Sequence, residues 1–245
     1  MGRFYFDTEY TNGNYYIGDI FEIAIVAEES GNVYHSYVHI DYKIPPYLKS
    51  MCNITDVILK EEGDAFNSVF NALINFIKFE EKNDGIPTLI AHGEYHFPLL
   101  LANCLKNKCD ISFLKQCNFI DSAFALRNGT NRVKCSLDAL CMDVLRKHIT
   151  HSAIGDVLLL KNVLEREEFR DVMKLSKIYS FFHLTEYLNA KLPVSFDEMK
   201  ILVENSERIE NLCYLLWTHV NKYSSLNKKH VYRIASIYFK KKYHA

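Results

Sequence analysis

Two short segments, far apart in the chain, contain the residues whose types and spacing could do chemistry. Near the start, Asp7 and Glu9 flank Thr8. On a strand, residues two apart point to the same face, so these carboxylates could share one divalent cation. Much later, His151 and Asp156 lie five residues apart, and a helix entrance between them would turn the imidazole toward water and the carboxylate toward the metal. Such a division of labour suits metal-assisted hydrolysis of a phosphodiester.

Length and charge limit the classes of protein that the chain can belong to. Its 245 residues, 49% hydrophobic and 24% charged, suffice for one large domain or for a domain with an appendage. A net charge of −1, from 29 basic and 30 acidic residues, argues against broad nonspecific attraction to nucleic acid and allows a local basic patch. Charged residues occur among the first ten, and no apolar run of about 18 residues occurs. We therefore predict an intracellular protein of the nucleus or cytoplasm, with no membrane partner.

The cysteines favour reduced thiols. They are seven, an odd number, and none forms a C-x-x-C pair. Reduced cysteines in an intracellular compartment fit this pattern best. A zinc site drawing on Cys104, Cys109, Cys117 or Cys135 with a histidine remains an alternative, and it would give the protein an architectural role.

The elements that must position the candidate residues follow from hydrophobic patterns. Residues 3–7, 20–27 and 33–40 read as three strands with short turns between them, which predicts an antiparallel meander. Residues 65–77 carry apolar side chains three or four apart, as in an amphipathic helix that packs on a sheet. Further strands are expected at 87–92 and 119–121, and further helices at 97–105, 136–145 and 152–164. The interleaving predicts an α/β fold, a mixed sheet with helices on its faces.

Several motifs together indicate a family. They are Phe4-Tyr5-Phe6-Asp7-Thr8-Glu9-Tyr10-Thr11, Leu89-Ile90-Ala91-His92, Tyr95-His96-Phe97-Pro98-Leu99-Leu100, Asp121-Ser122 and His151-Ser152-Ala153-Ile154-Gly155-Asp156-Val157. In order and separation they resemble the DnaQ-like, DEDDh class of 3′-to-5′ exonucleases, and most closely the three-prime repair exonucleases. The resemblance covers residues 1–165, implies a ribonuclease H-like fold for them, and leaves 166–245 as a helical C-terminal extension.

The second exonuclease motif departs from the family pattern. The family has an A-H-N stretch followed by aromatic-Asp-Phe-Pro-Leu-Leu, whereas this chain is about two residues shorter and has His96 where the third metal-binding aspartate belongs. Magnesium prefers oxygen ligands, while manganese tolerates nitrogen better. Three readings stay open: His96 is itself a ligand, a shifted loop brings in the carboxylate of Glu94, or His96 is only a polar residue at a helix start.

The resemblance implies how the site would work. Asp7, Glu9 and Asp156 would hold two Mg²⁺ ions, for which Mn²⁺ could substitute, with Asp7 bridging them. His151 would activate water for attack on the terminal phosphodiester of a nucleic acid with a free 3′ end, and the product would be a nucleoside monophosphate. Thr11 would touch the terminal nucleotide, and Tyr10 could stack a base. Related exonucleases include dimers, but no pattern here supports a homo-oligomer.

The resemblance does not extend to the C-terminal extension, whose structure is predicted from its hydrophobic pattern and charges. Ser195 and Glu198 have the spacing of a capping box, and apolar residues follow at helical spacing up to Val220. Residues 228–242 are basic and amphipathic, which fits either a nucleic-acid or partner contact or a helix solvated by lysines. For the whole chain, two functions are expected: a metal-dependent 3′-to-5′ exonuclease with weakened activity, or a catalytically inactive exonuclease-like module that binds nucleic acid or protein.

Overall fold

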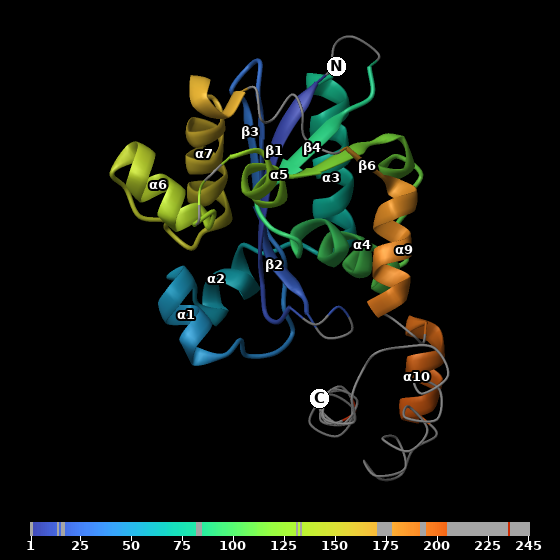
Figure 1. The fold of residues 1–245 in the computed structure, drawn as a ribbon. Helices are drawn as coiled ribbons and strands as arrows, with labels where there is room; N and C mark the ends of the chain where they lie inside the picture. Colours follow the sequence, from blue (N-terminus) through green and yellow to red (C-terminus); the bar gives the residue numbers. More distant parts are fainter. Residues whose placement is uncertain are drawn as a thin grey trace.

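A six-stranded sheet with helices on both faces forms the body of the protein (Figure 1). The structure is a computed structural model that describes residues 2–13, 15, 18–81, 85–130, 132, 134–170, 178–191, 195–204 and 235. The strand order is β3-β2-β1-β4-β5-β6. The predicted α/β fold with a mixed sheet is confirmed.

The first three strands form the predicted antiparallel meander. β1 (Arg3–Tyr10) pairs with β2 (Ile20–Ala27), and β2 pairs with β3 (Val33–Tyr37). β1 runs three residues beyond the predicted end, and β3 stops at Tyr37, short of residue 40. β2 is buried along its whole length because helices cover both faces of the sheet. Between β1 and β2 the pairing places Glu9 opposite Glu22.

The remaining strands make the sheet mixed. β4 (Thr88–Ala91) pairs in parallel with β1, and β5 (Asn118–Asp121) pairs in parallel with β4. β6 (Tyr179–Ser180) closes the far edge antiparallel to β5. The carboxyl ends of β1, β4 and β5 therefore lie side by side at the same end of the sheet, where residues that follow parallel strands can converge.

One face of the sheet packs on α3 (Phe66–Glu80), α4 (His96–Lys106) and α9 (Phe181–Lys191). Phe6 of β1 is fully buried there and stacks on Phe97 of α4, with ring centroids 5.6 Å apart. Burying an aromatic side chain of this size stabilises the fold by about 2 kcal/mol. This contact also ties the strand that bears Asp7 to the helix that begins at His96.

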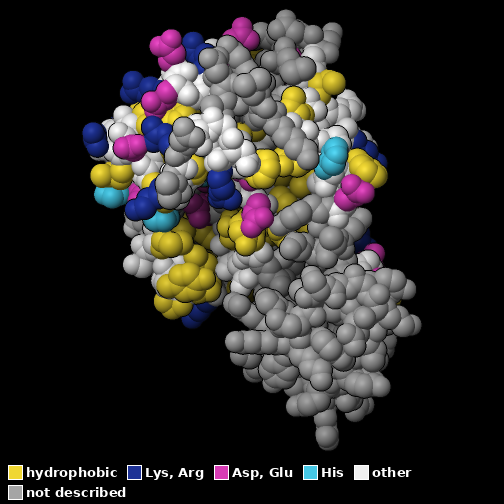
Figure 2. All heavy atoms as spheres, in the orientation of Figure 1, with side chains coloured by type: hydrophobic (Ala, Val, Ile, Leu, Met, Phe, Trp, Pro, Cys, Tyr) yellow, Lys and Arg dark blue, Asp and Glu magenta, His cyan; other side chains and the backbone are white. Residues whose placement is uncertain are grey.

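The opposite face packs on α5 (Ser122–Gly129), α6 (Leu137–Leu145) and α7 (Ala153–Leu164). α7 lies across β1 and β2 and buries Val157 and Leu160 against Tyr5. A smaller cluster beside β2 joins α1 (Pro46–Cys52) to α2 (Asp56–Glu61). Figure 2 shows hydrophobic side chains gathered over these two helices, where Tyr47, Met51 and Val57 are exposed.

The sequence predicted α3, α4, α6 and α7 within a few residues, and it missed the helices α1, α2, α5 and α9 and the short strand β6. α10 (Phe196–Glu204) starts at the predicted capping box, since the N–H of Ser195 donates to Oε2 of Glu198 (2.9 Å) and the N–H of Glu198 donates to Oγ of Ser195 (3.2 Å). The predicted apolar helix up to Val220 and the basic segment 228–242, apart from residue 235, lie outside the described residues.

The division into 1–165 and 166–245 stays a prediction. β6 and α9, which follow residue 165, pair with β5 and pack against α4. Among the residues that the structure describes, no helix has the length and apolar content needed to cross a membrane.

Candidate active site

Three carboxylates converge at the end of the sheet where β1, β4 and β5 have their carboxyl ends. Asp7 and Glu9 point to the same face of β1, and Asp156 comes from the first turn of α7, which packs across that face. The ligand atoms of the three side chains all lie within 4.8 Å of one another. Asp7 is 6% exposed and Asp156 5% exposed, and Glu9 is half-buried. The structure thus brings together the acidic residues that the two sequence motifs predicted.

The loop before α7 holds Asp156 in place. The backbone N–H of Thr150 donates to Oδ1 of Asp156 (2.7 Å), and the Thr150 hydroxyl donates to the same oxygen (2.9 Å). Ser152 caps the helix by accepting from the N–H of Gly155 (3.2 Å). A Cβ at Gly155 would lie 2.0 Å from Oγ1 of Thr150, so only glycine leaves room for this arrangement. Since both bonds from Thr150 end on Oδ1, Oδ2 of Asp156 is left for the carboxylate cluster.

Negative charge is concentrated in the cluster. Burial, followed by the charges of Glu9, Asp156 and Glu22, raises the pKa of Asp7 well above its usual range. Burial, Glu22 and Asp156 likewise raise the pKa of Glu9 to about 7, against a hydrogen bond from the Cys52 thiol (Sγ to Oε2, 3.7 Å) that lowers it. Ionised together, these groups repel one another in a poorly solvated place. A bound cation would relieve that repulsion.

Glu22 adds a fourth carboxylate that the sequence analysis did not single out. It lies directly opposite Glu9 and is only 2% exposed. Its Oε1 lies 2.9 Å from Nε2 of His35 on β3. The alternation within β2 places Glu22 on the same face as Ala24, so the signal was an acid inside an otherwise apolar strand.

His96 lies beside the carboxylates at the start of α4. Its Nδ1 accepts from the backbone N–H of Thr8 (3.3 Å) and lies 3.1 Å from the Thr8 hydroxyl. Its Nε2 lies 3.5 Å from Oδ1 of Asp7. Burial, and then the neighbouring His92, lower the pKa of His96 to about 4, so the ring is neutral at pH 7. With Nδ1 occupied as an acceptor, the proton of the neutral ring is on Nε2, on the side of Asp7.

Glu94 lies elsewhere. Its side chain is exposed and lines a different cavity, together with Phe97 and Asp121. The loop turns at Gly93, whose φ is 112° and whose N–H donates to Oδ1 of Asp121 (2.9 Å). This path directs residue 94 away from Asp7 and Glu9.

The cluster lies in an open cleft of about 620 Å³. His151 lines the cleft with the carboxylates, is half-buried, and has a φ of 53°, in the left-handed region that few non-glycine residues adopt. Arg127 of α5 and Tyr47 and Met51 of α1 also line it, and none of these three was predicted as a site residue. The cleft therefore combines the carboxylates with one cationic side chain and an apolar wall.

The two predicted substrate contacts differ in their availability. Tyr10 lines the cleft, and its ring centroid lies 6.5 Å from that of Tyr95, which is 42% exposed. Thr11 also borders the cleft, but its Oγ1 accepts from the N–H of Asp19 (3.0 Å) and lies 3.2 Å from the Tyr42 hydroxyl. The hydroxyl of Thr11 is therefore engaged in the fold, whereas the ring of Tyr10 is presented to the cleft.

The zinc alternative has no geometric support in the described ranges. Asp7, Glu9 and Asp156 are the one group of three or more possible metal ligands found there. The described cysteines are free, and all except Cys109 are buried.

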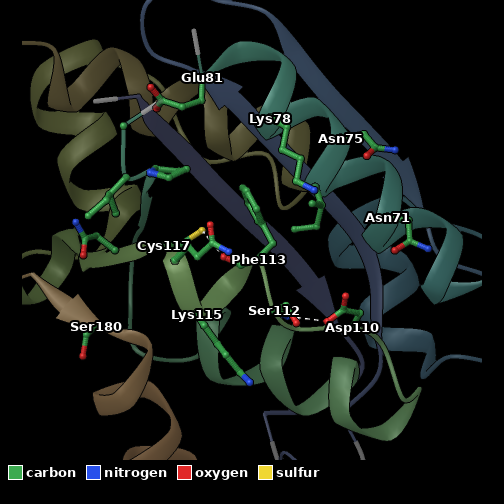
Figure 3. A pocket seen from close by; sticks show the side chains of 16 residues that line it. Asn71, Asn75, Lys78, Glu81, Asp110, Ser112, Phe113, Lys115, Cys117 and Ser180 are labelled. Carbon is green, nitrogen blue, oxygen red and sulfur yellow. Dashed lines mark hydrogen bonds between the residues drawn. The ribbon is translucent and has the colours of Figure 1, made fainter. Parts of the chain in front are cut away.

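A separate hollow of about 1180 Å³ lies at the opposite end of the strands from the cleft, near the starts of β4 and β5 (Figure 3). Lys78 lies over the ring of Phe113 there, 5.3 Å from its centroid, and the N–H of Ser112 donates to Asp110 (2.9 Å). Its lining mixes amides with charges of both signs and contains none of the cleft residues named above.

Comparison with known proteins relates this fold to nucleases. No protein-family model matches the chain, and no curated protein matches it. Among solved structures, the nuclease domain of 3′hExo, a DEDDh family member bound to rAMP, superimposes with a TM-score of 0.59 at 17% identity, over 73% of this chain and 96% of that one.

Two further structures are similar. A 3′-exonuclease solved for 3′-end specific recognition of a histone mRNA stem-loop gives a TM-score of 0.58 at 14% identity, over 73% of this chain and 84% of that one. A full-length 3′-exonuclease gives 0.57 at 16%, over 72% of this chain and 62% of that one. The chain therefore has the fold of DEDDh 3′-exonuclease nuclease domains.

Proposed function

We propose that the protein is a metal-dependent 3′-to-5′ exonuclease that hydrolyses terminal phosphodiesters of DNA or RNA and releases nucleoside monophosphates. The observation that carries the proposal is the convergence of Asp7, Glu9 and Asp156, whose ligand atoms lie within 4.8 Å of one another. They stand in a cleft, on a fold that is shared with DEDDh 3′-exonucleases. We propose nucleic acid with a free 3′ end as the partner.

The residues present fit divalent cations. No Lys or Arg of the described ranges forms an ion pair with any of the three carboxylates, although two of them are buried. Hard oxygen ligands of this kind select Mg²⁺, with Mn²⁺ as a substitute, and we propose that Asp7, Glu9 and Asp156 hold two such ions. When bound, the ions supply Lewis-acid stabilisation of the charge that develops on the phosphate.

The other cleft residues have distinct roles in this proposal. His151, which lines the cleft with the carboxylates, takes the proton of the attacking water, a role in which histidine is the commonest side chain. Thr150 fixes the orientation of Asp156 through its two hydrogen bonds. Arg127 attracts a backbone phosphate, and Tyr10 offers its ring to a base.

His96 is the reason to expect weakened activity. We propose that it takes the place of the third metal-binding aspartate of DEDDh exonucleases, and it is not part of the group of converging ligand atoms. We propose that it positions Asp7 and ligates no metal, because its Nδ1 lone pair is used by Thr8 and the Nε2 proton faces Asp7. The same departure supports the second candidate function, a catalytically inactive module that binds nucleic acid or protein.

Degradation assays separate the two functions. A 5′-labelled single-stranded DNA and its RNA counterpart are incubated in Mg²⁺ and, separately, in Mn²⁺, with Asp7→Asn as the test variant. Asp41→Asn, whose side chain is 94% exposed, is the matched control. We expect a ladder that shortens from the 3′ end with the native chain and with the control, and no ladder with Asp7→Asn. Strand binding without cleavage in either metal would refute the exonuclease and establish the binding module.

A further inference from the structure

A second, mostly apolar cavity lies next to the cleft. It has a volume of about 330 Å³, at the lower end of the range for ligand sites. Four aromatic rings line it: Phe97, Phe119, Phe124 and Tyr179. The rings of Phe124 and Tyr179 meet edge to face with centroids 6.4 Å apart, and Phe124 is 42% exposed. Aromatic walls in a space of this size suit a flat ring.

The charges around this cavity exclude an anion. Asp121 and Glu94 line it, and neither Lys nor Arg is among its described lining residues. Burial, and then the Asp121 carboxylate, raise the pKa of the Tyr179 phenol, which places that negative charge at the aromatic wall. A phosphate group would be repelled here, whereas a neutral ring with N–H donors would be attracted.

Hydrogen-bonding groups remain available on two walls. Asp121 accepts from the N–H groups of Gly93, Ala123 and Phe124, and all three bonds end on Oδ1, so Oδ2 is an acceptor without a partner among the described residues. His183 accepts on Nδ1 from the N–H of Ser180 (3.3 Å), which leaves Nε2 as the donor of its ring. The cavity thus presents both an acceptor and a donor to a ring between its aromatic walls.

α5 and the loop before α4 connect the cavity to the cleft. Gly93 lines both spaces. On α5, Arg127 lines the cleft and Phe124 lines the cavity, and residues three apart on a helix are neighbours on its surface. A cation that could attract a phosphate and a ring that could stack on a base are therefore neighbours on the surface of one helix.

We propose that the cavity is a nucleobase subsite, which takes one unpaired base of the strand held in the cleft and favours bases with an amino group. The inference rests on the proposed function, because the strand in the cleft is its source of bases. Phe124 stacks on the base, Tyr179, whose ring lies at 72° to that of Phe124, contacts the edge of the base, and Oδ2 of Asp121 accepts from the exocyclic amine. Stacking on a single aromatic side chain typically changes affinity by about tenfold.

Binding measured without hydrolysis tests the subsite. Single strands with 2-aminopurine at each of the last few positions are titrated with protein in EDTA, and both quenching of the fluorescence and overall affinity are recorded. We expect one position to be quenched most strongly, and we expect Phe124→Ala to weaken binding about tenfold and to abolish that quenching. Phe182→Ala is the matched control, since Phe182 lies on α9, is 65% exposed and is not a lining residue of the cavity.

A second pair of variants tests the amino preference. Strands with adenine or unsubstituted purine at the quenched position are compared, and we expect adenine to bind more tightly to the native chain. Asp121→Asn retains a helix-capping oxygen but replaces the second oxygen with an amide NH2, which donates and cannot accept, so the preference should disappear. Equal quenching by native chain and Phe124→Ala would overturn the subsite and leave the exonuclease intact. Tight binding and quenching without any 3′ degradation would instead refute the proposed catalysis and retain the subsite.

Discussion

Glu9 and Glu22 lie directly opposite each other on β1 and β2, and Glu22 is almost fully buried. Like charges opposite each other in an antiparallel pair destabilise it, and here two more carboxylates, Asp7 and Asp156, lie nearby. Electrostatic repulsion between these carboxylates destabilises the metal-free protein, and a cation bound at the cluster would reduce that repulsion. We therefore expect cation binding to raise the melting temperature of the protein.

The pH dependence of that stability follows from Glu9. Its pKa rises from an ordinary 4.5 to about 7 on folding, so folding favours its protonated form. The stabilisation from this group is complete below about pH 4.5 and is lost as the pH rises through about 7. Because Mg²⁺ binds the ionised carboxylates, we expect it to raise the melting temperature more at about pH 8 than at about pH 6. An equal rise at both values, measured by calorimetry, would contradict this account.

Replacing Glu22 tests the repulsion between Glu22 and Glu9 without removing any of the three proposed metal ligands. Glu22→Gln keeps an oxygen that can accept from His35 but removes the charge opposite Glu9. We expect the metal-free protein to gain about 0.5 kcal/mol in free energy of unfolding near pH 8, measured by urea denaturation. The melting-temperature rise that Mg²⁺ produces should shrink. Glu29→Gln, at an exposed position after β2, is the control and should change neither quantity.

Introducing an acid at residue 96 tests the role of the histidine. His96→Asp would remove the acceptor of the Thr8 N–H, at a cost of about 1 kcal/mol in stability, and would add an oxygen ligand beside Asp7. If His96 only positions Asp7, cleavage in Mg²⁺ should rise by roughly tenfold or more, with a smaller gain in Mn²⁺. A fall in the rate in both metals would show that the native imidazole is needed at the site.

The sequence predicted the positions of the candidate site residues that lie on regular elements. Strand alternation placed Asp7 and Glu9 on one face, and the helix start at Ser152 placed Asp156. It could not decide between His96 and Glu94, because that depends on the loop at Gly93, whose φ of 112° directs residue 94 out of the cleft. A positive φ at one glycine changes the path of a loop without leaving a periodic signal.

Short elements escaped prediction for a different reason. α1 and α2 have seven and six residues, less than two full turns, so no repeating apolar face is visible in their sequences. α5 begins directly after β5, and Asp121 both ends the strand and caps the helix. The pairing of Glu9 with Glu22 also depends on register, which shifts between Glu9 and Tyr10. Three residues that line the cleft, Tyr47, Met51 and Arg127, lie on these missed helices.

The close approach of Gly155 to Thr150 predicts that alanine at residue 155 lowers the stability of the protein, the opposite of its usual effect in a helix. Alanine usually stabilises a helix by about 1 kcal/mol relative to glycine. At Gly155, however, the new Cβ would lie 2.0 Å from Oγ1 of Thr150 and displace the hydroxyl that donates to Asp156. We therefore expect Gly155→Ala to lower both the melting temperature and the cleavage rate.

A double-mutant cycle assigns the cause of that loss. Thr150→Ala removes the clashing hydroxyl but retains the backbone N–H that donates to Asp156 (2.7 Å). If the clash with Oγ1 is the cause, Gly155→Ala should destabilise the native background and be neutral or stabilising in the Thr150→Ala background. The double variant should then cleave at the rate of Thr150→Ala alone. Additive losses in the cycle would mean that Gly155 is required for another reason, such as the contacts of 3.0 Å that the new Cβ would make with Cβ at residue 150 and with Oγ of Ser152.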